Sequence, residues 1–77
     1  MENFEDFESA LNSDRPYGSL RGVVKWLLAA GADREGLRVS LEAFRTQLRG
    51  AGRDADDDVV LEVLDDLTGW TSPHRKL

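Results

Sequence analysis

The apolar residues of this chain recur at the three- and four-residue spacing of an amphipathic helix, and this constrains the fold more than any other feature. The pattern is clearest over about residues 19–30 and from about residue 33 to Gly50. The apolar positions are Leu20, Val23, Val24, Leu27 and Leu28 in the first stretch and Leu37, Leu41, Phe44 and Leu48 in the second. Gly31 stands where a left-handed residue commonly ends a helix. Strand-like alternation occurs nowhere, so the sequence predicts an all-α fold.

Two further helices are expected, over about residues 4–12 and 55–68. We expect N-caps at Asn3, Ser19, Asp33 and Asp54, whose short polar side chains can accept a hydrogen bond from the first turn. The Pro16–Gly18 stretch is interpreted as a turn, and Gly69 as a helix end followed by Trp70 folding back. The predicted fold is a small bundle of three main helices plus a short N-terminal helix, with short connections. Residues 1–70 would form one helical domain and residues 71–77 a flexible C-terminal tail.

The composition excludes several classes of function. The chain has 77 residues and no cysteine, so it can use neither a disulfide nor a thiol nucleophile. Its single histidine, His74, lies in the polar tail, where it cannot be held for acid–base catalysis. No apolar run approaches the roughly 20 residues of a membrane span. We therefore expect a cytoplasmic protein without enzymatic activity, cofactor, metal or membrane. A homodimer would enlarge the small core and is left open.

Charge is distributed in three blocks. Residues 1–14 and 54–77 each carry a balance of −5, whereas residues 15–53 carry eight bases and three acids, a balance of +5. Arg34, Arg38, Arg45 and Arg49 of the third helix fall within about 60° of one another beside its apolar stripe. Two interpretations follow. The arginines pair with acids of the first or fourth helix, or they form a basic rim that binds an acidic partner.

Trp26 is placed away from the apolar stripe of its helix, on the side that it shares with Gly22 and Ala29. A tryptophan among small residues makes a flat apolar surface of the kind that dominates protein interfaces. The alternative is that Trp26 packs under the N-terminal segment or Tyr17. With the neighbouring Lys25 and the four arginines, Trp26 completes the predicted partner-binding set.

The function that these features favour is a small protein-interaction or regulatory module with a protein partner. An antitoxin or immunity protein is one concrete form, by analogy of size and charge only. The alternative is a helix-turn-helix-like DNA-binding regulator that uses the third helix, since VVKWLLAAGADREGLRVSLEAFR has a glycine-containing turn before a basic helix. The net charge of −5 disfavours binding to nucleic acid, whose affinity comes largely from phosphate neutralisation.

The stretch DADDDVVLEVLD, residues 54–65, begins like a calcium-binding loop. Asp54, Asp56 and Asp58 supply the first three oxygen positions. Val59, however, occupies the position that requires glycine, and Asp65 stands where a longer glutamate is needed. We therefore interpret the stretch as the acidic first turns of a helix, where carboxylates face the positive end of the helix dipole. Asp65 and Asp66 are expected to be solvated.

Overall fold

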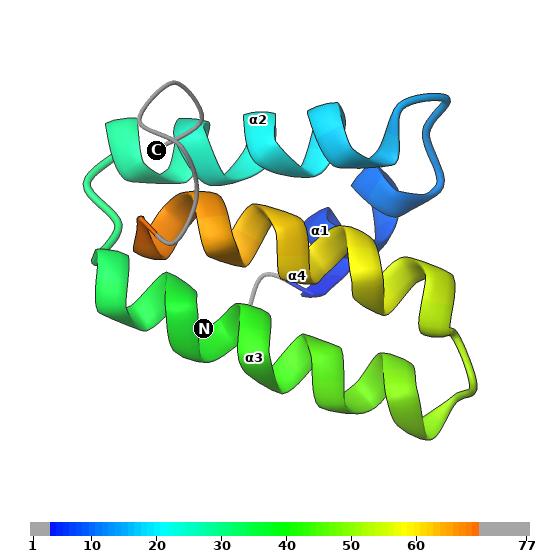
Figure 1. Cartoon of the computed structure of the whole chain (residues 1–77). Coiled ribbons are helices and arrows are strands. Elements are labelled where there is room, and N and C mark those ends of the chain that lie inside the picture. Colours follow the sequence, from blue (N-terminus) through cyan, green and yellow to red (C-terminus); the bar gives the residue numbers. More distant parts are fainter. Residues whose placement is uncertain (1–3, 70–77) are drawn as a thin grey trace.

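The computed structural model describes residues 4–69, and these fold into a bundle of four helices (Figure 1). The helices are α1 (Phe4–Leu11), α2 (Pro16–Ala29), α3 (Arg34–Gly50) and α4 (Asp54–Thr68). Residues 4–69 contain no strand. The predicted all-α class is therefore confirmed, with three longer helices and a short first one. The predicted tail at 71–77, together with Asn3, Trp70 and His74, lies outside the described residues.

The start of α2 differs from the sequence-based expectation. The helix begins at Pro16 and not after Ser19, so the interpretation of Pro16–Gly18 as a turn was wrong. Proline fits the first helical position because the backbone N–H that it lacks has no partner there. Ser19 is therefore not the N-cap. Its backbone N–H donates to the Arg15 carbonyl within the helix, and its hydroxyl accepts from Ser13 Oγ at 2.7 Å.

The ends of the other helices match the prediction in part. The Asp33 carboxylate caps α3 by accepting from the Gly36 backbone N–H at 2.8 Å, as expected. Gly31 and Gly69 have positive φ values of 100° and 84° and end their helices as predicted. The predicted cap at Asp54 was wrong, because Arg53 occupies the N-cap position without a side-chain cap and Asp54 is already helical.

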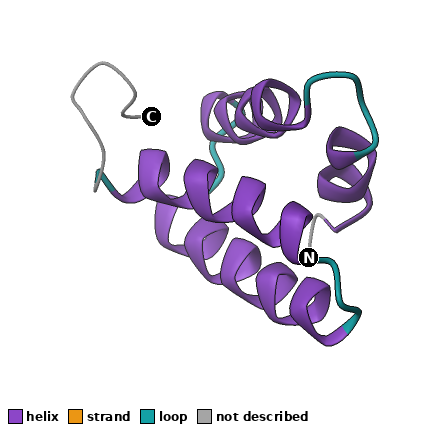
Figure 2. Ribbon diagram, turned by 45° about the vertical axis from the view of Figure 1, so that its right-hand side comes forward, coloured by secondary structure: helices purple, strands orange, loops and turns teal. Residues whose placement is uncertain are grey.

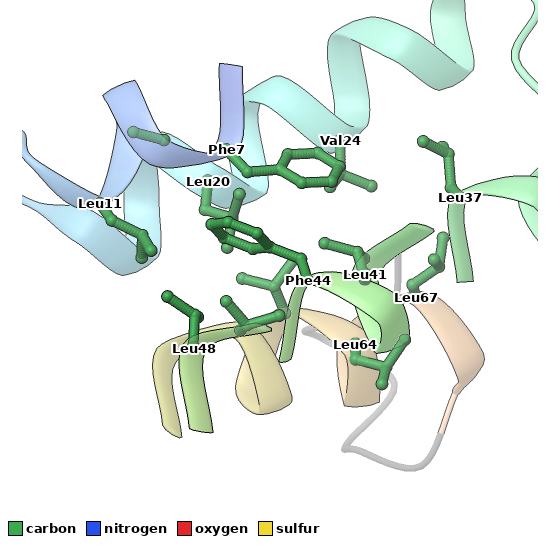
Figure 3. Close-up of a cluster of buried hydrophobic side chains, with 13 residues drawn as sticks. Phe7, Leu11, Leu20, Val24, Leu37, Leu41, Phe44, Leu48, Leu64 and Leu67 are labelled. Carbon is green, nitrogen blue, oxygen red and sulfur yellow. The ribbon is translucent and has the colours of Figure 1, made fainter. Parts of the chain in front are cut away.

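All four helices contribute to one hydrophobic core, seen in Figure 3. Its buried residues are Phe7, Ala10, Leu11, Leu20, Val24, Leu37, Leu41, Phe44, Leu48, Val60, Val63, Leu64 and Leu67. The Phe44 ring lies 5.5 Å from that of Phe7 and 5.1 Å from that of Phe4, between centroids. Tilted aromatic pairs at this distance stabilise the fold by more than the burial of their apolar area alone. They attach the short α1 to α3.

The helices are arranged as a closely packed α3–α4 pair, with α2 against α4 and α1 against α2 (Figures 1 and 2). In Figure 1, α2 and α4 both run from right to left and α3 runs the opposite way. No helix among residues 4–69 is long and apolar enough to cross a membrane.

Candidate protein-binding surface

Trp26 and Lys25 lie on the side of α2 that faces away from the core. Trp26 is 65% exposed, although tryptophan has one of the largest apolar side chains. The predicted exposure of Trp26 is thus confirmed, and it does not pack under Tyr17 or the first helix. Lys25, Gly22 and Ala29 around it are also exposed. Residues 15–32 contain no carboxylate, so this face offers apolar surface and positive charge only.

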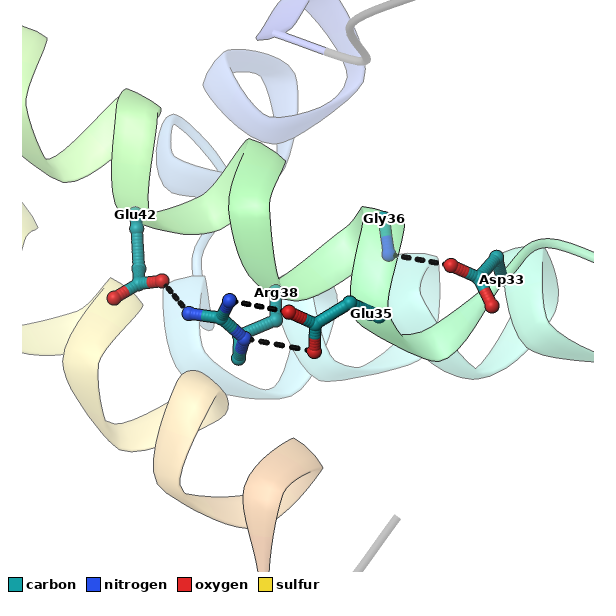
Figure 4. Close-up of polar contacts among 5 residues, drawn as sticks. All are labelled: Asp33, Glu35, Gly36, Arg38 and Glu42. Carbon is teal, nitrogen blue, oxygen red and sulfur yellow. Dashed lines mark hydrogen bonds and ion pairs between the residues drawn. The ribbon is translucent and has the colours of Figure 1, made fainter.

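Arg38 forms its ion pairs within α3 (Figure 4). Its guanidinium donates to both carboxylate oxygens of Glu35, one turn before it, and to Glu42, one turn after it. These hydrogen bonds lower the pKa of the Glu35 carboxyl and raise the pKa of Arg38. The charge of Arg38 is therefore balanced on its own helix surface.

The other arginines of α3 have different surroundings. Arg45 Nε donates to Asp57 Oδ1 on α4 at 2.8 Å, and this bond raises the pKa of Arg45. Arg34 donates to the Leu67 carbonyl at 2.8 Å, at the C-terminal end of α4. Arg49 is exposed and has no ion-pair partner among residues 4–69. The four arginines share one helix, but the structure does not bring them together as one unpaired basic surface.

Arg53, which the sequence did not single out, joins α1 to the start of α4. It occupies the N-cap position of α4 and donates to both Glu8 oxygens on α1, at 2.5 and 2.7 Å. Its Nε also donates to Asp56 at 2.9 Å. The hydrogen bond from Arg53 lowers the pKa of Glu8, and the two carboxylates raise the pKa of Arg53.

Asp66 is the main departure from the predicted surface chemistry. It was expected to be solvated, but it is 0% exposed, at the junction of α2 and α4. Its Oδ2 accepts hydrogen bonds from the Tyr17 hydroxyl and from Arg21 Nε, the latter at 3.3 Å. A buried carboxylate requires such partners, because desolvation alone would strongly disfavour its charge. The pairing spans 49 residues in sequence, so no local pattern could have indicated it.

A shallow cleft of about 490 Å³ lies between α1 and α3. It is lined by Phe4, Glu5, Glu8, Ser9, Asn12, Phe44 and Gln47. The cleft contains none of the predicted partner-binding residues, which all lie elsewhere on α2 and α3. Within residues 4–69, no group of three or more side chains is arranged to hold a metal ion, and this range includes the Asp54–Asp65 stretch.

Comparison of the chain with protein-family models, with curated proteins and with solved structures finds no match. The physical properties of its surface are therefore the basis for inferring what it does.

Proposed function

We propose that this protein is a non-catalytic, cytoplasmic interaction module that binds a protein partner through the outward face of α2. The observation that carries the proposal is Trp26, which is 65% exposed on a stretch without carboxylates. Exposing so large an apolar side chain is unfavourable in water, and interfaces are enriched in tryptophan because its burial supplies much of their affinity.

The charge around Trp26 indicates the chemistry of the partner. Lys25 is exposed and has no ion pair among residues 4–69. Asp14 and Asp33, which bracket the helix, are the nearest carboxylates in sequence. A partner surface that combines apolar contact for Trp26 with carboxylates for Lys25 would fit this face. An antitoxin or immunity protein remains one form that such a module could take.

Affinity capture with the full chain tests this proposal. Native protein immobilised at high density, which retains weak complexes too, should capture a partner from its own cell lysate, whereas Trp26→Ala should weaken the captured complex at least tenfold. Salt should weaken it too, because it screens the contact of Lys25. Val39→Ala on α3 is the matched control, since Val39 is also a large exposed apolar side chain, 53% exposed. Equal capture by native and Trp26→Ala protein would contradict the proposal.

The DNA-binding alternative stays a prediction without a supporting contact. Arg38 and Arg45 are already paired with carboxylates, and Arg34 with a carbonyl, which leaves Arg49 as the unpaired arginine of α3 within residues 4–69. Phosphate binding needs several free cations on one face. A gel-shift experiment at low salt distinguishes the two functions, because a shift at micromolar protein would favour DNA.

A further inference from the structure

The outward side of α2 carries four residues in a row along the helix. Gly18, Gly22, Lys25 and Ala29 follow the spacing of four, three and four residues that keeps side chains on one face, and all are exposed. We call these four residues the outer α2 face, and Trp26 borders it. Glycine weakens a helix interior, yet a Cβ at Gly22 would meet nothing within 4 Å. The fold of a single copy therefore gives no reason for glycine there.

The outward side of α4 has the same spacing and the opposite charge. This row, which we call the outer α4 face, consists of the exposed Asp54 and Asp58 and the half-buried Leu61 and Asp65. The helix contains no basic residue. None of the three carboxylates forms an ion pair within residues 4–69, although Asp65 interacts electrostatically with Arg45 on α3. Like charges one turn apart repel each other, so this face gains from an external positive charge.

Both faces lie on the same side of the layer that α2 and α4 form. Tyr17 and Arg21 on α2 contact Asp66 on α4, which fixes the sides where the helices meet. At about 100° per residue, each outer face lies about 90° from this contact line, and the core residues lie about 90° in the opposite direction. Because the two helices share one core, their outer faces are both opposite to it.

We propose that the partner of the α2 face is a second copy of this chain, in a two-fold dimer in which the outer α2 face of each copy packs on the outer α4 face of the other. This rests on the proposed function, since it identifies the partner of that surface. The helices run in the same direction (Figure 1), so a two-fold axis along them forms both contacts at once. Lys25 then lies among the carboxylates of α4, and the glycines leave room for Leu61.

The size of the contact predicts a weak dimer. α2 and α4 have 14 and 15 residues, so each is about 21 Å long. Each copy contributes two such helix faces about 10 Å wide, so the four faces of the dimer bury about 800 Å² in total, below the usual 1,200–2,000 Å² of stable complexes. The dimer should therefore dissociate at micromolar concentrations.

Sedimentation velocity on the full chain, from micromolar to millimolar concentration, tests the inference. Native protein should pass from monomer to dimer over this range. Glu62 is exposed and lies beside the outer α4 face. The variants Lys25→Glu and Glu62→Lys should each stay monomeric. An equimolar mixture of the two variants should dimerise again, because each introduced charge meets an opposite charge on the other variant. Gly22→Gln should fold at least as stably as native protein, by circular dichroism, and remain monomeric.

Two results would overturn the inference. One is native protein that stays monomeric at millimolar concentration, and the other is a dimer that both charge variants leave intact. If either occurs while affinity capture still depends on Trp26, the proposed function stands with a different protein as partner. Loss of the Trp26 dependence would instead overturn the proposed function itself.

Discussion

At the scale of single residues, Asp66 provides the sharpest prediction. Asp66→Ala leaves Arg21 and Tyr17 beside a buried gap, and we expect it to lower the free energy of unfolding by about 3 kcal/mol. Tyr17→Phe, which removes the hydrogen bond to Asp66, should cost about 1 kcal/mol. Urea unfolding followed by circular dichroism measures both. Glu62→Gln is the control on the same helix, because Glu62 is exposed. An effect of Asp66→Ala no larger than that of the control would mean that Asp66 is not buried as described.

The Glu8 carboxylate gives a prediction about pH. Its pKa in the folded state is lowered by the hydrogen bond from Arg53. A carboxyl whose pKa is lower in the folded than in the unfolded state contributes stability above its unfolded pKa, and loses it as the pH falls through the folded value. The Glu8→Gln variant should therefore lose less stability than native protein between about pH 5 and 3, where an unfolded carboxyl titrates. The effect should be small because Glu8 is partly exposed.

Thermal unfolding at a series of pH values measures this effect. Glu5→Gln serves as the control, since Glu5 is exposed on the same helix and forms no ion pair within residues 4–69. A pH profile of Glu8→Gln that coincides with the native profile would contradict a stabilising role for the contact between Arg53 and α1.

At the scale of helices, two glycines should respond to alanine with opposite signs. Gly22 lies inside α2 with open space around its Cβ position, so Gly22→Ala should stabilise the fold by up to about 1 kcal/mol. Gly31 has a φ of 100°, which a side chain resists, so Gly31→Ala should destabilise it by about 1 to 2 kcal/mol. Urea unfolding midpoints, taken at protein concentrations low enough to keep the chain monomeric, compare the two. Equal shifts for both variants would refute this assignment of helix interior and helix end.

The helices also show what local sequence can and cannot predict. Apolar spacing predicted the existence of all four, and Gly31 and Gly69 marked the ends correctly. The starts of α2 and α4 were placed too late, because Pro16 can begin a helix as well as interrupt one, and because Arg53 takes the N-cap position without a side-chain cap. The exposure of Trp26 followed from its place on α2. The burial of Asp66 did not, since it depends on Tyr17, far away in sequence.

At the scale of the whole molecule, the three blocks of charge fold onto one another. Arg53 pairs with Glu8 from the acidic N-terminal block, and Arg45 pairs with Asp57 from the acidic C-terminal block. The predicted pairing with acids of the first or fourth helix is therefore confirmed for Arg45 and extends to Arg53. Lys25, Arg49 and the outward carboxylates of α4 stay outside these pairs within residues 4–69. These groups are the charges that a partner can contact. The distribution of charge along the sequence does not by itself identify them.

The size of the molecule makes its stability depend on a few core residues. A chain of 77 residues has an expected free energy of unfolding of only about 4 to 12 kcal/mol. Phe44 is buried at the centre of the core and contacts the rings of Phe4 and Phe7 on α1. Phe44→Ala should cost about 3 to 5 kcal/mol, because it removes a large apolar side chain and leaves a cavity.

This loss is a large fraction of the total, so Phe44→Ala should be substantially unfolded at physiological temperature by circular dichroism. Trp26→Ala should instead change the free energy of unfolding by less than about 0.5 kcal/mol, because surface substitutions rarely exceed that value. The pair of variants separates the two roles of large aromatic side chains in this chain: Phe44 holds the helices together, and Trp26 is exposed to a partner. A Trp26→Ala variant as unstable as Phe44→Ala would show that Trp26 is part of the core and would remove the basis for the binding surface.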